Sequence, residues 1–297
     1  MSYIVLIGYP LRHSVSPVFQ QAALDYHGLD TRYEAWEAAS IGELERALEK
    51  MRNEGCLGGN VTVPYKEAVL PLLDEVDEVS RRIGAVNTVV ATGNRLVGSN
   101  TDVEGFLEGL VVTGGFDPVG KRVVMLGAGG VARAAGYGLA GRGVASLVIS
   151  SRSWERAASL AADLGSHVAG GGGIGQSLRT SVVAVEWETG RSGENLRDAD
   201  LIVNCTTVGM RHGPSEGESL LRVEDIPRGV LVYDLVYNPW PTPLLRRAEE
   251  AGAAILGGLS MLVYQGAASF ELWTGRKAPV ELMMRKARGA VLRNGVV

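Results

Sequence analysis

Short apolar, β-branched segments alternate with longer helix-like segments along most of this chain, and this alternation limits the folds that it can adopt. In the first third, strand-like runs are expected over 3–7, 31–38 and 57–63, with helix-like segments over 16–28 and 41–54 between them. Strands that alternate with helices at this spacing are typical of sheets covered by helices. The pattern therefore predicts an α/β fold.

The rest of the first third is less regular. Helical material is expected over 66–83, and strands over 86–91 and 95–97 then flank Thr92-Gly93-Asn94, which has the composition of a hairpin turn. The first domain is expected to end near Asp102.

A second alternating series begins at Val123 and predicts a mostly parallel, Rossmann-type sheet. Its strands are expected at 123–126, 147–150, 201–204, 230–235 and 253–256, and its helices from about Gly130 and over 154–164. The segment 166–198, rich in glycine and polar residues, is expected to be an elaborated surface region without chemistry. Terminal helices are expected over 259–273 and 280–292. The predicted domains are 1–103 for substrate and 104–259 for a dinucleotide, with 260–297 packing back on the first.

The amino-acid composition of the chain argues against several classes of function. A chain of 297 residues is long enough for two domains, and a net charge of −4 without a basic stripe argues against a nucleic-acid partner. The apolar runs are shorter than the roughly 18 to 20 residues that span a bilayer. Two cysteines predict a reducing, cytoplasmic setting, and four dispersed histidines predict no metal site. A homodimer is one assembly compatible with the sequence.

The sequence VVMLGAGGVARAA, starting at Val123, has the features of a dinucleotide-binding turn. A strand leads directly into Gly127-x-Gly129-x-x-Ala132, and helical residues follow. The first glycine permits a tight turn, the second lets a pyrophosphate approach backbone N–H groups, and the small third residue lets helix and strand pack closely. A purely structural turn is the alternative.

The end of the next strand predicts which dinucleotide binds. An acidic residue there would bind the ribose 2′-hydroxyl of NAD, but the chain has Ser151, Arg152 and Ser153, and then Arg156 one helical turn later. Guanidinium and hydroxyl groups suit a 2′-phosphate, so NADP is predicted. Alternatively, both arginines are ordinary solvated side chains at the start of a helix.

The first domain contains a run of hydroxyl and amide side chains, GNVTVPYK, that ends in Lys66, and an NTD sequence at 100–102 offers Asp102 as its partner. A lysine paired with an aspartate suits proton transfer. Without further information, Lys66 is equally well explained as a surface lysine that opens a helix, and Asp102 as the N-cap of a helix beginning near Val103.

These motifs, in this order, resemble those of shikimate dehydrogenases along nearly the whole chain. The matching sequences are HSVSP from 13, GGNVTVPYK from 58, GAVNTV from 84, NTD from 100, GAGGVARA from 127, NCTTVGM from 204, DLVYNPWPTPLL from 234 and GGLSMLVYQGAASFELWTG from 257. The resemblance implies reversible, NADPH-dependent reduction of 3-dehydroshikimate to shikimate in chorismate biosynthesis, with Lys66 and Asp102 as the catalytic pair.

The resemblance also implies site residues. For the substrate they are Ser14, Ser16, Thr62, Lys66, Asn87, Asp102, Tyr237 and Gln265. For the cofactor they are Gly127, Ala128, Gly129, Gly130, Val131, Ala132, Ser151, Arg152, Ser153, Arg156, Thr206, Val208, Met210, Val236, Gly258 and Met261, with Asn204 beside them. Ser16 has an alternative interpretation as the cap before Pro17, whereas Ser14 has no such local role, and Met261 is alternatively helix core.

Two other functions stay open. A quinate/shikimate or aminoshikimate dehydrogenase would share the Lys66 and Asp102 pair, although a serine at position 16 favours shikimate over quinate. A non-catalytic NADP-binding sensor would have no need for that pair. The family often has Asn-Arg-Thr where this chain has Ser151-Arg152-Ser153, which predicts a less strict preference for NADP.

Overall fold

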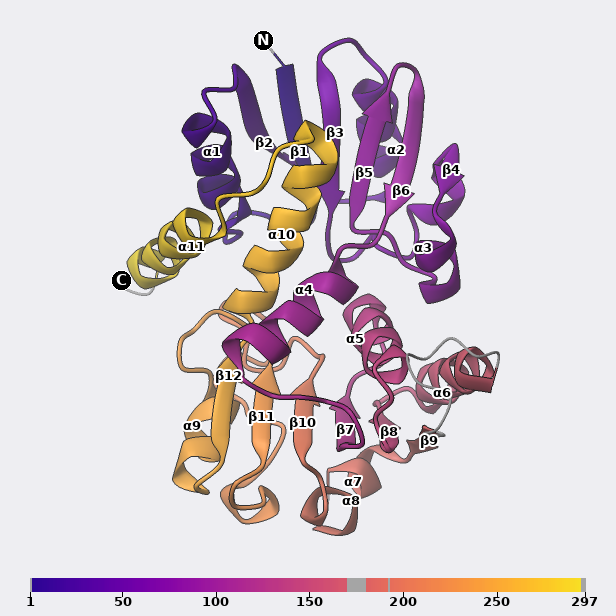
Figure 1. The fold of residues 1–297 in the computed structure, drawn as a ribbon, viewed down its shortest axis with the longest axis vertical. Coiled ribbons are helices and arrows are strands. Elements are labelled where there is room, and N and C mark those ends of the chain that lie inside the picture. The colour runs from indigo at the N-terminus through magenta and orange to yellow at the C-terminus, as the bar shows by residue number, and fades with distance from the viewer. Residues whose placement is uncertain (1, 170–179, 192, 295–297) are drawn as a thin grey trace. The chain divides into compact units, whose positions relative to one another are not determined.

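The computed structural model describes residues 2–169, 180–191 and 193–294, and the chain divides into two compact units. The first unit consists of the chain up to Gly105 together with the chain from Leu262 onward, and the second consists of Phe106–Met261. Each unit contains one sheet, as the α/β prediction requires (Figure 1).

The sheet of the first unit is mixed. Within the described residues its strand order is β2-β1-β3-β5-β6-β4. Strands β1, β2 and β3 are parallel, β5 is antiparallel to both β3 and β6, and the short β4 is parallel to β6. The bounds are β1 Ser2–Gly8, β2 Thr31–Glu37, β3 Cys56–Val61, β4 Glu75–Val76, β5 Thr88–Thr92 and β6 Arg95–Ser99. The predicted hairpin is confirmed, with Gly93 at φ 60° in its turn and strands that extend further toward the C-terminus than expected.

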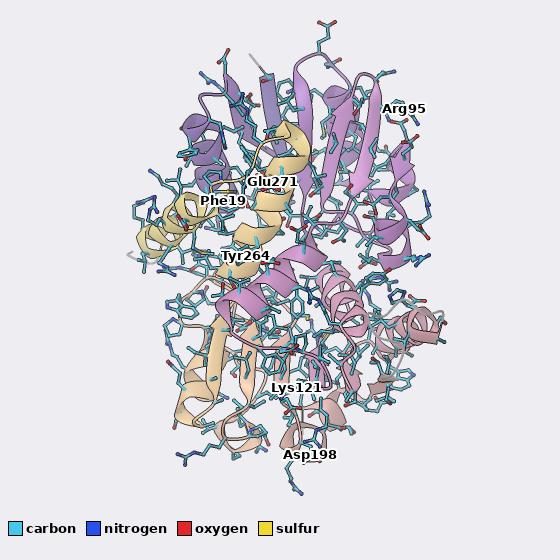
Figure 2. The ribbon with its side chains drawn as sticks, viewed as in Figure 1. Phe19, Arg95, Lys121, Asp198, Tyr264 and Glu271 are labelled. Carbon is cyan, nitrogen blue, oxygen red and sulfur yellow. The ribbon has the colours of Figure 1, made fainter. Side chains whose placement is uncertain are left out.

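Helices α1 (Ser16–Tyr26), α2 (Ile41–Met51), α3 (Glu78–Ile83) and α11 (Val280–Asn294) belong to the first unit, and α1 packs against α11. Helix α2 is capped by the Ser40 hydroxyl, which accepts from the Glu43 N–H, and its Leu44 and Leu48 side chains are buried. On α1, Phe19 is fully buried, whereas Arg95 on β6 is exposed (Figure 2).

Helix α10 (Leu259–Thr274) contributes its later turns to the first unit, where they lie close to the sheet. The Trp273 indole donates a 2.9 Å hydrogen bond to the Val89 carbonyl, and Gln20 of α1 donates one of 2.8 Å to the Gly266 carbonyl. Gly58 permits this packing, since a Cβ there would lie 2.6 Å from the Trp273 ring nitrogen and the backbone has φ +146°.

The prediction of helical material over 66–83 is wrong for most of that range. Turns lead into a 3₁₀ turn at Leu70–Leu72, β4 follows, and only α3 is helical. Pro71 and the Asp77 cap, which accepts a 2.6 Å hydrogen bond from the Ser80 N–H, divide the segment into these short pieces. The expected helix over 41–54 also ends earlier, at Met51.

The sheet of the second unit is parallel throughout the described strands, in the order β12-β11-β10-β7-β8-β9. Counted from the unit's first strand, this is the 3-2-1-4-5-6 order of the doubly wound dinucleotide-binding fold. The bounds are β7 Arg122–Leu126, β8 Ser146–Ser150, β9 Ser181–Val185, β10 Leu201–Asn204, β11 Leu231–Asp234 and β12 Ala254–Gly257.

Both faces of this sheet are covered, which explains why its strands carry runs of consecutive apolar residues rather than alternating ones. Val123 and Met125 belong to one core cluster, whereas Val124 and Leu126 belong to another. The unit begins within α4 (Asp102–Glu108), which continues into a π-helical turn at Gly109–Thr113. Its other helices are α5 (Gly130–Gly141), α6 (Trp154–Ala169), α7 (Trp187–Gly190), α8 (Gly193–Arg197) and α9 (Pro243–Glu250). The unit boundaries fall inside α4 and α10.

The interpretation of 166–198 as a surface elaboration is wrong in part. Helix α6 continues to Ala169, and Ser181–Val185 forms β9, the edge strand next to β8. Residues 170–179 and 192 of this segment lie outside the described residues.

None of the described helices is both long and apolar enough to cross a membrane.

Candidate functional site

Lys66 and Asp102 form an ion pair in the first unit. The Lys66 ammonium donates a 2.6 Å hydrogen bond to Asp102 Oδ2, and the two side chains are 17% and 3% exposed. The backbone around Lys66 is anchored, because its carbonyl accepts from the Val86 N–H and the buried Tyr65 hydroxyl donates to the Ala38 carbonyl. Lys66 is therefore not a surface lysine that opens a helix.

Both oxygens of Asp102 accept hydrogen bonds. Oδ1 accepts from Asn87 Nδ2 at 2.9 Å, in addition to the bond from Lys66. Helix α4 begins at Asp102 itself, and the Asn100 side chain accepts from the Asp102 N–H at 3.0 Å. The interpretation of Asp102 as an N-cap is therefore wrong, and its carboxylate serves side chains that come from two other segments.

Asn87 connects this pair to α10. Its Nδ2 also donates to Gln265 Oε1 at 3.0 Å, and Gln265 Nε2 donates to the Leu262 carbonyl. Asn87 is 2% exposed and Gln265 8%. The structure thus brings four of the predicted substrate residues together, although they are far apart in sequence.

Sequence reasoning missed the hydroxyls behind Asn87. Thr88, Thr101 and Ser269 are buried with their hydroxyls within hydrogen-bond distance of one another, and Asn60 donates to two of them. The sequence did contain one indication that Ser269 lies near the site. Gln265 and Ser269 are four residues apart on a helix and so share a face.

Three further predicted substrate residues belong to the first unit. They are Ser14 in the loop before α1, Ser16 at the start of α1, and Thr62 directly after β3. Helix α1 begins at Ser16 with Val15 at the cap position, so the interpretation of Ser16 as the N-cap is wrong. The expectation that Ser14 has no local role is also wrong, since its hydroxyl accepts from the Ser16 N–H at 3.3 Å. Thr62 follows β3 and its N–H donates to the Ile7 carbonyl. Tyr237, half-buried, belongs to the second unit.

The predicted cofactor residues follow the carboxyl ends of the parallel strands in the second unit. Because parallel strands end at the same edge of a sheet, these residues share one edge. Gly127 to Ala132 follow β7, Ser151 to Arg156 follow β8, Thr206 to Met210 follow β10, Val236 follows β11, and Gly258 and Met261 follow β12. Met261 is also part of the buried core, as its alternative interpretation supposed.

The turn after β7 has the geometry that a pyrophosphate requires. Gly127 has φ +116°, and a Cβ there would lie 3.0 Å from the Cys205 backbone, so glycine is needed for the turn itself. At Gly129, by contrast, a Cβ would meet nothing within 4 Å. Gly129 precedes α5 and offers no side-chain cap, which leaves the first N–H groups of the helix available to an anion. These residues fit a dinucleotide.

The segment after β8 contains an acidic residue near its predicted phosphate ligands. The Ser153 hydroxyl accepts from the Arg156 N–H at 3.3 Å and donates to Glu155 Oε2 at 2.9 Å. The backbone N–H of Glu155 and this hydroxyl lower the pKa of the Glu155 carboxyl. The Ser153 hydroxyl therefore already has local partners.

A second buried carboxylate lies at the end of β11. Asp234 is 0% exposed, and it accepts from Asn204 Nδ2 at 2.8 Å, from the Val236 N–H at 3.0 Å and from the Thr242 hydroxyl at 2.6 Å. Burial raises the pKa of Asp234 to about 6 despite these bonds. Asn204 in turn accepts from the Thr206 N–H and hydroxyl, both at 2.8 Å.

Comparisons with known proteins agree with the motifs. A family model described as the shikimate dehydrogenase substrate binding domain matches residues 6–89, and one described as the shikimate 5′-dehydrogenase C-terminal domain matches 258–288. A curated shikimate dehydrogenase (NADP(+)) of Moorella thermoacetica is 46% identical over 97% of this chain and 93% of its own length. The chain belongs to the shikimate dehydrogenase family. The Rossmann-type fold predicted for it is confirmed as well.

Solved structures of similar proteins superpose on this chain. Shikimate 5-dehydrogenase of Thermus thermophilus, in complex with NADP(H) and shikimate, has a TM-score of 0.82 at 37% identity, covering 98% of this chain and 100% of that one. Quinate dehydrogenase of Corynebacterium glutamicum, in complex with NAD, has a TM-score of 0.84 at 32% identity, covering 97% and 99%. The family thus includes proteins with different substrates and cofactors.

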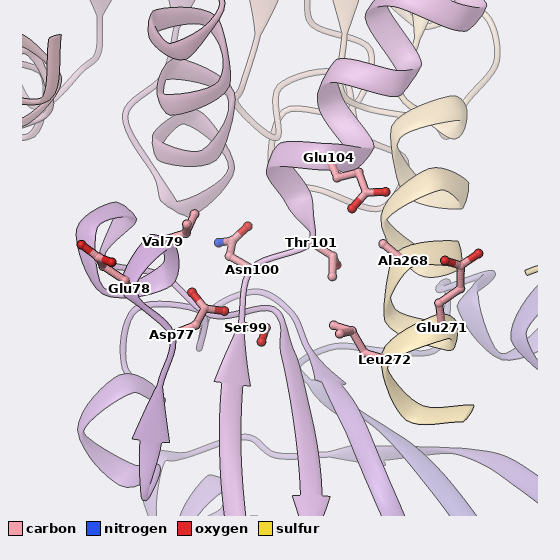
Figure 3. A pocket seen from close by; sticks show the side chains of 10 residues that line it. All are labelled: Asp77, Glu78, Val79, Ser99, Asn100, Thr101, Glu104, Ala268, Glu271 and Leu272. Atoms are coloured by element: carbon pink, nitrogen blue, oxygen red, sulfur yellow. The ribbon is translucent and has the colours of Figure 1, made fainter. Parts of the chain in front are cut away.

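A pocket of about 500 Å³ in the first unit is lined in part by Asn100 and Thr101, which precede Asp102 (Figure 3). Its acidic lining residues are Asp77, Glu78, Glu104 and Glu271. Two of these carboxylates serve local structure, because Asp77 caps α3 and Glu271 accepts from the Ala278 N–H at 2.9 Å. Among the described residues no group of three or more potential metal ligands was found.

Proposed function

We propose that this protein catalyses the reversible, NADPH-dependent reduction of 3-dehydroshikimate to shikimate. The observation that supports this most directly is the Lys66 and Asp102 ion pair, held by Asn87 and Gln265, in a member of the shikimate dehydrogenase family. NADPH, when bound, supplies the hydride.

Lys66 provides the proton that the reduced carbonyl needs. Addition of hydride to a ketone leaves negative charge on its oxygen, and an ammonium close to that oxygen both stabilises the charge and donates the proton. Asp102 holds the ammonium at 2.6 Å and so fixes where it points. In the reverse direction Lys66 accepts the proton from the substrate hydroxyl.

The remaining predicted residues of the first unit suit a polyhydroxylated acid. Asn87, Asp102, Gln265 and Thr62 offer both donors and acceptors for ring hydroxyls, each of which costs about 1 to 3 kcal/mol if buried without a partner. The hydroxyls of Ser14 and Ser16 are proposed to bind the substrate carboxylate, with Tyr237 as a further donor. The Ser14 hydroxyl can donate to a carboxylate while it accepts from the Ser16 N–H.

In the second unit, the N–H groups at Gly129 to Ala132 are proposed to bind the pyrophosphate, and Arg152 with Arg156 the 2′-phosphate. Thr206, Val208, Met210, Val236, Gly258 and Met261 are proposed to contact the nicotinamide end. These assignments are supported by their shared position at the carboxyl edge of the sheet.

A matrix of initial rates tests this proposal. Shikimate and quinate are each supplied with NADP⁺ and with NAD⁺, and formation of the reduced nicotinamide is followed by its absorbance. The highest kcat/KM is expected for shikimate with NADP⁺. Faster turnover of quinate with NAD⁺ would assign the activity of the quinate dehydrogenase relative instead, and absence of turnover with every pair would favour a non-catalytic sensor.

The cytoplasm is the proposed location. Cys56 and Cys205 are both free and buried, as expected in a reducing compartment. A homodimer stays a prediction, which sedimentation velocity measures directly.

A further inference from the structure

Three buried hydroxyls form a triangle next to the Lys66 and Asp102 pair. Thr88 Oγ1 lies 2.7 Å from Ser269 Oγ and 3.1 Å from Thr101 Oγ1, and the third side, between Thr101 and Ser269, is also 3.1 Å. Thr88 and Ser269 are 0% exposed and Thr101 is 5% exposed. Each of the three hydroxyls therefore has protein groups as its hydrogen-bonding neighbours.

The Thr88 hydroxyl helps to hold the Asn87 amide in one orientation. Asn87 Oδ1 accepts from the Thr101 N–H at 2.8 Å and from the Thr88 hydroxyl at 3.0 Å. A backbone N–H only donates and an ionised carboxylate only accepts, so the atom facing Thr101 must be the amide oxygen and the atom facing Asp102 must be the amide nitrogen. A flipped amide would place its oxygen against the carboxylate.

The hydroxyls also link Asn87 to the helix that carries Gln265. Ser269 Oγ donates to the Gln265 carbonyl at 2.9 Å, and Asn60 Nδ2 donates to Ser269 at 3.1 Å and to the Asn87 carbonyl at 3.1 Å. Asn60 itself is held by the Tyr33 hydroxyl, which donates to its Oδ1 at 2.8 Å. Every bond in this chain is buried and leads toward Asn87 or Gln265.

We propose that Thr88 and Ser269 are positioning residues for the reaction proposed above, acting on the Lys66 and Asp102 pair through the fixed amide of Asn87. Asp102 then keeps one oxygen for Lys66 because its other oxygen is held by Asn87. Without the Thr88 hydroxyl, Asn87 Oδ1 loses one of its hydrogen-bond donors, so the amide is held less tightly and the direction in which Lys66 presents its proton becomes less defined. The proposal rests on the proposed function.

The test compares Thr88→Val, which removes the hydroxyl at nearly constant shape, with Thr88→Ser, which keeps it. Thr31→Val is the matched control, because Thr31 is also a buried strand threonine of the first unit and its hydroxyl bonds to Ser2. Wild type and variants are compared for kcat, KM for shikimate, NADP⁺ affinity by fluorescence, the pH profile of kcat and the thermal midpoint.

We expect Thr88→Val to lower kcat by about 10- to 100-fold and to shift the pH profile of kcat, with NADP⁺ affinity within about twofold of wild type. Thr88→Ser is expected to restore most of kcat, and Thr31→Val to leave kcat unchanged. A folded Thr88→Val protein with normal kcat and an unshifted profile would overturn the proposal. So would loss of kcat to the same extent in Thr31→Val, since that result would indicate general destabilisation.

Ser269→Ala provides a second route if Thr88→Val does not fold, because alanine is favourable within a helix. We expect kcat to fall by about 3- to 10-fold, and the double variant to lose less than the product of the two single losses, since both act through Asn87. Unchanged kcat in folded Ser269→Ala, or independent losses in the double variant, would contradict the shared route. Absence of shikimate-dependent turnover in the wild type, by contrast, would reject the proposed function itself.

Discussion

Asn204 donates a 2.8 Å hydrogen bond to Asp234, and this bond joins the carboxyl ends of two neighbouring parallel strands, β10 and β11. The same carboxylate holds the Val236 N–H and the Thr242 hydroxyl. One buried carboxylate thus holds the start of both loops that carry predicted nicotinamide contacts.

Asp234 should make the second unit more stable in mild acid. Its pKa rises from 3.8 to about 6, so the folded state binds the proton more tightly than the unfolded state does. The stabilising contribution is complete below about pH 4 and is lost as the pH rises through 6, by about 3 kcal/mol in total. Compared with Asp234→Asn, wild type should therefore gain relative stability between pH 7 and 4, measured by hydrogen exchange of β11 amides. A difference that does not change with pH contradicts this.

Lys66→Ala should lower kcat by about 10² to 10⁴-fold, the usual effect of removing a proton-transfer group, while NADPH affinity changes little. Steady-state rates and fluorescence titration measure the two quantities separately. Lys286→Ala, at an exposed position on α11, is the control and should behave as wild type. Near-normal turnover without the Lys66 ammonium would remove this residue from the reaction.

Gly127→Ala and Gly129→Ala should separate folding from cofactor binding. At Gly127 the positive φ and the 3.0 Å approach to the Cys205 backbone make alanine destabilising by about 1 to 3 kcal/mol. Gly129 has ordinary φ and open space, so alanine should leave the thermal midpoint nearly unchanged yet weaken NADPH binding at least about 10-fold, since its methyl group occupies the pyrophosphate's approach. Equal effects of both substitutions on stability would contradict the distinction.

Arg152→Ala should weaken NADPH binding by about 10- to 100-fold and leave NADH binding almost unchanged, because a charge-assisted hydrogen bond contributes about 1.5 to 3 kcal/mol. The readout is the ratio of the two dissociation constants, and Arg285→Ala on α11 serves as the control. A parallel loss for both nucleotides would show that Arg152 does not recognise the 2′-phosphate.

The sequence predicted the second unit well because its buried strands β7, β10 and β11 each carry a run of consecutive apolar residues that is followed by glycine or a polar residue. It failed at 66–83, where a proline and an aspartate cap outweigh helical propensity, and at β9, whose pairing with β8 depends on a distant strand. The hydroxyl triangle was also missed, since Thr88, Thr101 and Ser269 meet only after folding. Single polar residues give no periodic signal in a sequence.

The first unit is assembled from the two ends of the chain, and this affects the order in which the protein is completed on the ribosome. The second unit is continuous, so all of it has been synthesised before the last turns of α10 are available. The bonds from Trp273 to Val89 and from Gln20 to Gly266 can form only after that segment has left the exit tunnel. A chain that ends before Leu262 and has been released from the ribosome should therefore have a protease-resistant second unit, whereas the sheet of the first unit should be susceptible.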